Sequence, residues 1–126
     1  MTTVTWLMLL GGVALNAAAQ LLLKAATRTS GVLVSDSGQI SWSAAEALLR
    51  AFPLWIGLSF YGVSVILWLG ALSKVPVSIA YPMLSIGYVV NAVAAVFLFS
   101  EALTTGKFIG ILLIIAGVIV LARAAP

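Results

Sequence analysis

The sequence predicts an all-α membrane protein with four transmembrane helices, and three observations support this fold class. Of the 126 residues, 63% are hydrophobic and only 7% are charged. Four apolar runs each approach the roughly 20 residues that a helix needs to cross a bilayer. The alternating segments of about 10 residues that are typical of a membrane β-barrel do not occur in the sequence. Because backbone polar groups in lipid must be satisfied within a segment, each run is expected to be an α-helix.

The spans are expected to form a single transmembrane domain over residues 1–126. We place them at about 4–25, 53–72, 77–99 and 105–123, with a polar loop over 29–52. More cations lie on the side of this loop than on the other side: Lys24, Arg28, Arg50 and Lys107 against Lys74 and Arg123. The positive-inside rule then places the loop in the cytoplasm and both termini outside, by a margin that leaves insertion in both orientations open.

The first span carries a stripe of polar side chains. Asn16, Gln20 and Lys24 recur every four residues, so an α-helix places all three on one face. Polar groups that face lipid are costly, so the stripe is expected to face a protein interior or a wet cavity. It offers hydrogen bonds and one positive charge, but no carboxylate that could carry a proton.

The polar loop contains two expected local structures. Residues 32–34 and 39–42 predict two short strands around a turn at 35–38, with a flexible loop as the alternative. Ser43–Glu46 has the spacing of a capping box, which predicts a short amphipathic helix over 44–52 at the membrane interface.

The third span carries a second polar stripe. Its members recur every three or four residues: Ser78, Tyr81, Ser85, Tyr88 and Asn91. Opposite the stripe of the first span, they would line a cavity of hydroxyls and amides that suits a polar or phosphorylated head group. The alternative is that these groups only join helices together, at about 0.6 kcal/mol for each hydrogen bond.

Pro82 and Gly87 are candidate hinge residues in the third span. Pro82 frees the carbonyl of Ser78 and should kink the helix, and Gly87 adds local flexibility. The sequence leaves open whether they provide a hinge for alternating access or only a static bend.

The fourth span is the candidate dimer interface. Gly106, Gly110 and Gly117 lie close to one face, and the first two have the small-residue spacing of closely packed helices. Four helices alone enclose a small cavity, so a homodimer or a heterodimer with a similar small subunit is expected to complete it.

Catalysis, metal binding and nucleic-acid binding are not expected. The acids are Asp36, Glu46 and Glu101, which lie outside the spans or at their ends, and the chain has no His or Cys. No nucleophile has a base beside it, no metal-ligand cluster exists, and no cofactor is implied. The net charge of +3 is scattered along the chain, which argues against a nucleic-acid surface.

Residues 68–85, WLGALSKVPVSIAYPMLS, resemble a block of the small flippase subunits for 4-amino-4-deoxy-L-arabinose-phosphoundecaprenol. These subunits belong to the drug/metabolite transporter superfamily and are related to the small multidrug resistance exporters. The resemblance extends to Gln20, Lys24, Glu101 and the glycines of the fourth span. It implies a small-multidrug-resistance-like bundle that works as a pair of similar subunits in a bacterial inner membrane.

Two positions depart from the multidrug branch of that superfamily. The proton- and drug-binding Glu of those exporters falls at Asn16, and their membrane Trp falls at Leu84, whereas Tyr81 matches. Without a buried acid, the exchange of a cationic drug for protons has no carrier.

The resemblance therefore implies a flippase or flippase subunit for a polyprenyl-phosphate-linked sugar, such as aminoarabinose-phosphoundecaprenol, or a related lipid phosphate. In this hypothesis Lys24 and Arg28 attract the phosphate, and the other residues of the two stripes bind the head group: Asn16, Gln20, Ser78, Tyr81, Ser85, Tyr88 and Asn91. One alternative is a small multidrug-resistance-type exporter of amine or guanidinium-like cations. The other is a non-transporting membrane subunit of a glycosyltransferase complex.

Overall fold

The computed structural model describes residues 2–125, and within them the chain forms six helices. They are α1 (Thr3–Ser30), α2 (Trp42–Arg50), α3 (Phe52–Leu72), α4 (Val77–Met83), α5 (Ser85–Leu98) and α6 (Thr105–Ala124). Four stretches are long and apolar enough to cross a membrane: α1, α3, α4 with α5, and α6. The predicted all-α fold class with four spans is confirmed.

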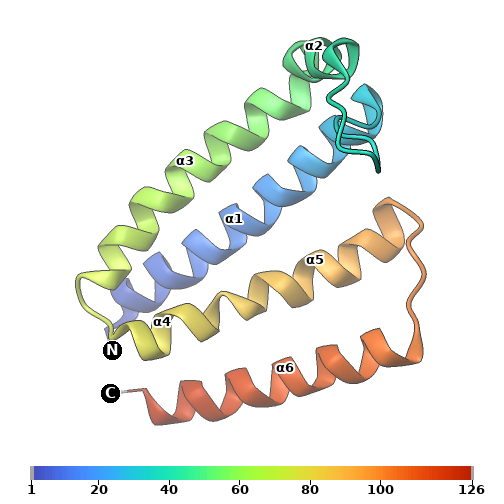
Figure 1. Ribbon diagram of the computed structural model, residues 1–126. Coiled ribbons are helices and arrows are strands. Elements are labelled where there is room, and N and C mark those ends of the chain that lie inside the picture. Colours follow the sequence, from blue (N-terminus) through green and yellow to red (C-terminus); the bar gives the residue numbers. More distant parts are fainter. Residues whose placement is uncertain (1, 126) are drawn as a thin grey trace.

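The long helices run up and down in sequence order (Figure 1). α1 and α3 form an antiparallel pair, α4 and α5 return along α1, and α6 lies outermost. Both termini therefore lie at one end of the bundle, and the polar loop and the connection between α5 and α6 lie at the other. We call this second end the loop end.

The first helix is longer than predicted. It continues past residue 25 to Ser30 and stops at Gly31, whose φ of 91° lies in the left-handed region. Hydropathy marks where the chain leaves the lipid, not where the helix ends, and the residues after Lys24 remain compatible with helix. The hydroxyl of Thr27 donates to the carbonyl of Lys24 at 2.8 Å, and the hydroxyl of Thr29 donates to that of Ala26.

The polar loop pairs around a turn at 35–38 as predicted, but the two predicted strands are reduced to a single bridge. Within the loop, the structure has a single antiparallel bridge between Val34 and Ile40. The amide of Ser35 donates to the carbonyl of Gln39 at 2.9 Å, and that of Ser41 donates to Leu33 at 2.8 Å. The pairing cannot lengthen because α1 occupies the chain up to Ser30 and α2 begins directly after Ser41.

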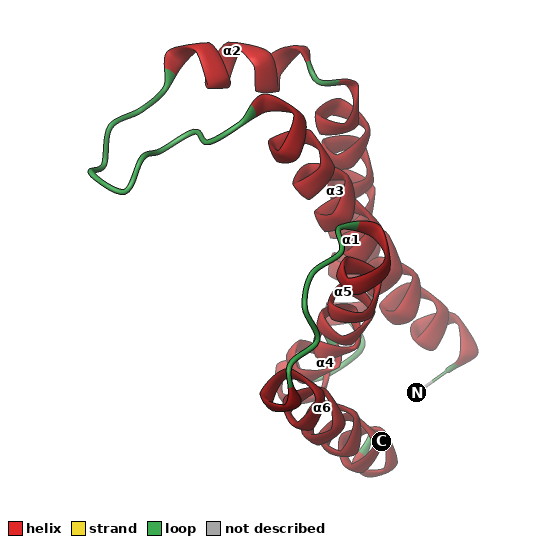
Figure 2. Cartoon of the chain, turned by 90° about the vertical axis from the view of Figure 1, so that its right-hand side faces the viewer, coloured by secondary structure: helices red, strands yellow, loops and turns green. Residues whose placement is uncertain are grey.

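The predicted short helix at the end of the polar loop exists, but its predicted start and cap are wrong. Ser41, not Ser43, is the N-cap, and its hydroxyl oxygen accepts a hydrogen bond from the amide of Ala44 at 3.3 Å. Glu46 binds Arg50 at 2.6 Å and so does not complete a capping box. α2 lies across the loop end of α1 and α3 (Figure 2). Its bounds are Trp42–Arg50 rather than 44–52.

Small residues let α1 and α3 approach closely. Gly57 of α3 is buried, and an added Cβ there would lie 3.1 Å from Leu22 Cβ and 3.2 Å from the carbonyl oxygen of Ala19. At the other end of the pair, a Cβ on Gly12 would lie 3.4 Å from the carbonyl oxygen of Ser64. The pair is therefore held by van der Waals contact along most of its length, as is usual for helices in lipid.

The third span is interrupted where the sequence predicts a kink. Pro82 lies in the last turn of α4, which ends at Met83, and α5 begins at Ser85. The hydroxyl of Ser85 donates to the carbonyl of Pro82. Met83 packs with Leu9, Ala71 and neighbouring residues in the main apolar core, at the end that holds the termini.

The fourth span is the least packed element. No residue of Thr105–Ala124 is buried, and α6 contacts the chain through α4 and α5. Its N-cap is Thr104, whose hydroxyl oxygen accepts from the amide of Lys107 at 3.2 Å.

Replacing Gly57 with Val should destabilise the protein, because the new side chain would press on Leu22 and the backbone of Ala19. We expect a loss of about 1–3 kcal/mol, seen as a lower midpoint of heat-induced aggregation in mild detergent. Gly62→Val is the matched control, since it lies on the same helix and a Cβ there meets nothing within 4 Å. Equal midpoints for the two variants would contradict this packing.

Candidate functional site

Three adjoining hollows run along α1 on the side that faces α5. The first has a volume of about 230 Å³ and is lined by residues of α1, α3 and α4 together with Leu84: Gly12, Asn16, Tyr61, Ser64, Val65, Trp68, Tyr81 and Leu84. The second has about 400 Å³ and is lined by Val13, Asn16, Gln20, Tyr61, Leu84, Gly87, Tyr88 and Asn91. The third has about 270 Å³ and is lined by Gln20, Leu21, Lys24, Asn91, Ala92, Ala95, Phe99 and Glu101.

The hollows adjoin one another, because neighbouring ones share lining residues. Asn16 lines the first and second, and Gln20 and Asn91 line the second and third. We call the three together the polar trough. It extends from the aromatic side chains of Trp68 and Tyr81 to the charged side chains at the loop end.

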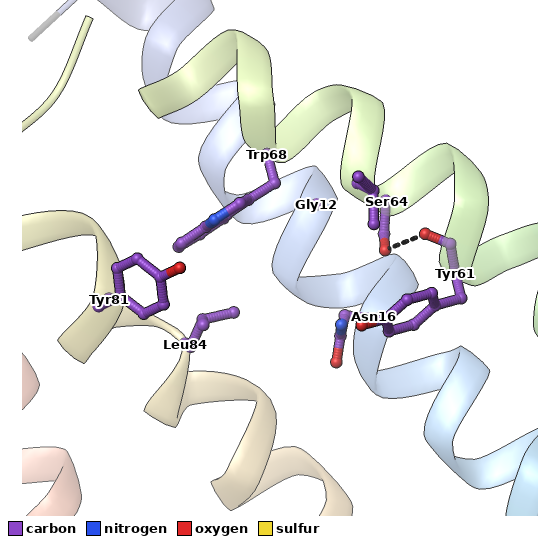
Figure 3. Close-up of a pocket in the computed structure, with 8 residues that line it drawn as sticks. Gly12, Asn16, Tyr61, Ser64, Trp68, Tyr81 and Leu84 are labelled. Atoms are coloured by element: carbon purple, nitrogen blue, oxygen red, sulfur yellow. Dashed lines mark hydrogen bonds between the residues drawn. The ribbon is translucent and has the colours of Figure 1, made fainter. Parts of the chain in front are cut away.

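Aromatic rings bound the trough at the end nearer the termini. Trp68 and Tyr81 meet edge to face, with ring centroids 5.7 Å apart and planes at 86°. Figure 3 shows both rings turned toward the hollow, with Asn16 and Tyr61 at its other side. The Ser64 hydroxyl donates to the carbonyl of Tyr61 at 2.6 Å, so this buried hydroxyl is satisfied within its own helix.

Asn91 is the unusual polar group of the trough. Its side-chain oxygen Oδ1 is buried and has no hydrogen-bond partner among the described residues. A buried acceptor without a partner costs about 1–3 kcal/mol, so such groups in native proteins call for an explanation. Because Asn91 lines both the second and the third hollow, a donor that enters the trough could satisfy it.

Charge is confined to the loop end of the trough. Lys24 of α1 and Glu101, in the connection after α5, both line the third hollow. The middle of the trough presents amides and hydroxyls from Asn16, Gln20 and Tyr61. A polar group could therefore move along it without passing an ionised side chain.

The structure brings together six of the nine predicted binding residues, namely Asn16, Gln20, Lys24, Tyr81, Tyr88 and Asn91. The other three do not line the trough. Ser78 is exposed in the first turn of α4, and Ser85 bonds to the carbonyl of Pro82. Arg28 lies over the ring of Phe99, which lines the third hollow, with the Arg28 Cζ 5.2 Å from the ring centroid.

Sequence reasoning missed the contribution of α3. Tyr61, Ser64 and Trp68 recur at three- and four-residue spacing and all line the first hollow. The same periodicity that identified the other stripes could have found this one. Glu101 was missed for another reason, because only the fold brings the end of α5 back beside Lys24.

The predicted hinge and dimer residues occupy different environments. A Cβ on Gly87 would lie 3.4 Å from Val13 Cγ1, so Gly87 allows close packing of α5 on α1. By contrast, a Cβ on Gly110 or Gly117 meets nothing within 4 Å. Their side of α6 is open, and its role as a dimer interface, like the hinge, stays a prediction.

Residues 37–114 match the family described as Small Multidrug Resistance protein, and the chain belongs to this family of transporters. It is a multi-pass membrane protein and not an enzyme.

Among its relatives, one from Enterobacter sp. (strain 638) is 44% identical over 97 residues, which is 74% of this chain and 91% of the relative. One from Pseudomonas fluorescens (strain Pf0-1) is 38% identical over 84 residues, 67% of this chain and 71% of the relative. A third, from Pseudomonas savastanoi pv. phaseolicola, is 31% identical over 121 residues, 96% of this chain and 99% of the relative. All three are named probable 4-amino-4-deoxy-L-arabinose-phosphoundecaprenol flippase subunit ArnE. No solved structure matches the chain at a significant level.

The trough should be reachable from water, and the natural sequence has no cysteine to interfere with a test. In liposomes, Asn16→Cys and Gln20→Cys should react with a water-soluble maleimide roughly tenfold faster than Leu112→Cys, because a thiol in lipid does not ionise. Leu112 is a suitable control because it is 50% exposed on α6, on a different face from Gly110 and Gly117, and would face lipid. Equal rates at the three positions would contradict a hydrated trough.

Proposed function

We propose that this chain is a subunit of a lipid flippase that moves a polyprenyl-phosphate-linked sugar, such as aminoarabinose-phosphoundecaprenol, across the bacterial inner membrane. The observation that carries the proposal is the polar trough, a row of three adjoining hollows that ends at Lys24. The relatives are named as flippase subunits for the same class of lipid.

The chemistry of the trough suits the head group of such a lipid. A sugar phosphate loses its water when it enters the membrane, and this desolvation is the main barrier to crossing. The amides of Asn16, Gln20 and Asn91 can replace hydrogen bonds that the sugar hydroxyls lose, while the ammonium of Lys24 binds the phosphate. Arg28, which lies over Phe99 beside the third hollow, adds a second positive charge that attracts the phosphate.

The open side of the trough allows the polyprenyl tail to remain in the lipid. Tyr81 and Tyr88 are 54% and 61% exposed, so the trough opens sideways between α3 and α5. The head group can travel inside it while the tail remains in lipid. A second small subunit, either a copy of this chain or a similar one, would cover this side, with α6 as a further contact surface.

The second candidate is a small multidrug-resistance-type exporter, which membership of the family favours. Such exporters couple an amine or guanidinium-like cation to protons through a membrane carboxylate. Here the corresponding position is Asn16, and no acid lies within the four spans. An amide neither gains nor loses a charge by protonation in the physiological pH range, so this mechanism lacks its carrier.

Lys24→Ala should weaken binding of undecaprenyl phosphate to the solubilised protein by about tenfold or more, because a charge-assisted hydrogen bond contributes about 1.5–3 kcal/mol. Native mass spectrometry at increasing lipid concentration measures the bound fraction. Lys74→Ala is the matched control, since Lys74 lies in the turn after α3, at the opposite end of the bundle. Equal lipid binding by the wild-type protein and Lys24→Ala would contradict the proposal. Proton-coupled uptake of a quaternary ammonium ion in proteoliposomes would also contradict it.

Pro82→Ala should slow translocation of a fluorescent polyprenyl phosphate about fivefold or more while leaving its binding unchanged, because a continuous third span cannot bend during the conformational step. Accessibility of the fluorophore to an external quencher in proteoliposomes measures the rate. Pro53→Ala is the control, because a proline in the first turn of α3 leaves the helix straight. Equal rates for the two variants would show that the interruption is only a static bend.

A further inference from the structure

We infer that the loop end of the trough selects head groups that carry an amine as well as a phosphate, with Glu101 and Asn91 binding the amine. The inference rests on the proposed function, because it concerns the same cargo. It adds a specificity residue, Glu101, that lies outside the membrane spans and has no counterpart in the two polar stripes.

Glu101 and Lys24 present opposite charges to one hollow without neutralising each other. Both line the third hollow, of about 270 Å³, from different elements of the fold. Among residues 2–125, the salt bridge of the structure joins Arg50 and Glu46. Neither the Glu101 carboxylate nor the Lys24 ammonium has an ion-pair or hydrogen-bond partner there.

The other cations near Glu101 have contacts of their own. Lys107 of α6 lines the hollow on the other side of Glu101, and its ammonium donates to the carbonyl of Ala102 at 2.9 Å. Arg28 lies over the ring of Phe99. Glu101 thus lines the trough, and its carboxylate has no ion-pair partner among the described residues.

The chain around Glu101 is held in place by the end of α5. The amides of Phe99 and Glu101 both donate to the carbonyl of Ala95, at 3.0 and 3.3 Å. Ser100 between them has a φ of 54°, a left-handed conformation that turns the chain back over the helix end. This turn puts Glu101 at the trough rather than out along the connection to α6.

Asn91 supplies a second acceptor in the same hollow. Its Oδ1 is buried and unpartnered among the described residues, and Asn91 lines the third hollow together with Glu101. An ammonium group has three N–H donors and no acceptor. It can therefore donate to both the Glu101 carboxylate and the Asn91 carbonyl oxygen while the phosphate binds Lys24.

This arrangement favours a zwitterionic head group over an anionic one. A lipid that carries a phosphate and a neutral sugar neutralises Lys24 but leaves Glu101 desolvated and unpaired. A head group with both charges neutralises both side chains. We therefore expect the protein to bind a sugar with an amine more tightly than the same sugar with a hydroxyl.

The test compares two undecaprenyl phosphates, one with a 4-amino pentose and one with the corresponding pentose that has a hydroxyl in place of the amine. Competition in native mass spectrometry should give about a tenfold preference of the wild-type protein for the aminated lipid. Glu101→Gln should reduce this preference to about threefold or less without weakening binding of the neutral-sugar lipid. Glu101→Asp should retain part of the preference for the aminated lipid. Glu46→Gln, on α2, is the control and should behave as wild type.

The outcomes separate this inference from the proposed function. If Glu101→Gln binds both lipids and keeps the full preference, the inference is overturned while the flippase proposal stands. If Glu101→Gln loses both lipids equally and also melts at a lower temperature, Glu101 has a structural role and the inference is overturned. If the wild-type protein binds neither lipid, both proposals fail.

Discussion

The close contact between α1 and α3 is the constraint on which the rest of the structure depends. At Gly57 the two backbones approach so closely that there is little room for a side chain, and this contact fixes how α1 is rotated about its axis. With one face of α1 packed on α3, the face that carries Asn16, Gln20 and Lys24 turns toward α5. Because lipid offers no hydrophobic driving force between helices, such close packing is the main source of attraction available to the pair. The polar side chains of α1 therefore line the trough because another face of this helix is packed against α3.

The trough itself combines two kinds of polar group with different energetic consequences. Hydroxyls such as those of Ser64 and Ser85 bond to a carbonyl in the preceding turn and remain satisfied whether or not anything occupies the trough. The amide oxygen of Asn91 has no such partner within the described chain. A groove lined only by the first kind would be inert. An unpartnered acceptor such as the Asn91 oxygen makes binding more favourable, because a donor that enters the trough can form the missing hydrogen bond.

The sequence was sufficient for the spans and for the polar faces, because both follow from local periodicity. Hydropathy located four helices, and the repeat of an α-helix placed Asn16, Gln20 and Lys24 together. The end of α1 and the cap of α2 depended instead on side-chain hydrogen bonds, such as that of Ser41 with Ala44, which several nearby serines could equally have made. The contribution of Tyr61 and the position of Glu101 depended on which helices become neighbours. That information lies in the tertiary packing, and no single segment contains it.

The exposed glycines of α6 have a consequence for how this helix is constrained. Gly110 and Gly117 touch nothing in their own chain at the point where a methyl group would sit. Each nevertheless weakens the helix by roughly 1 kcal/mol relative to alanine when judged by helix propensity in water. Folding of the single chain would therefore tolerate, or even favour, alanine at both positions. At the dimer interface predicted for α6, a side chain at these positions would instead meet a neighbouring molecule, so the tolerance of α6 to substitution would measure assembly rather than folding.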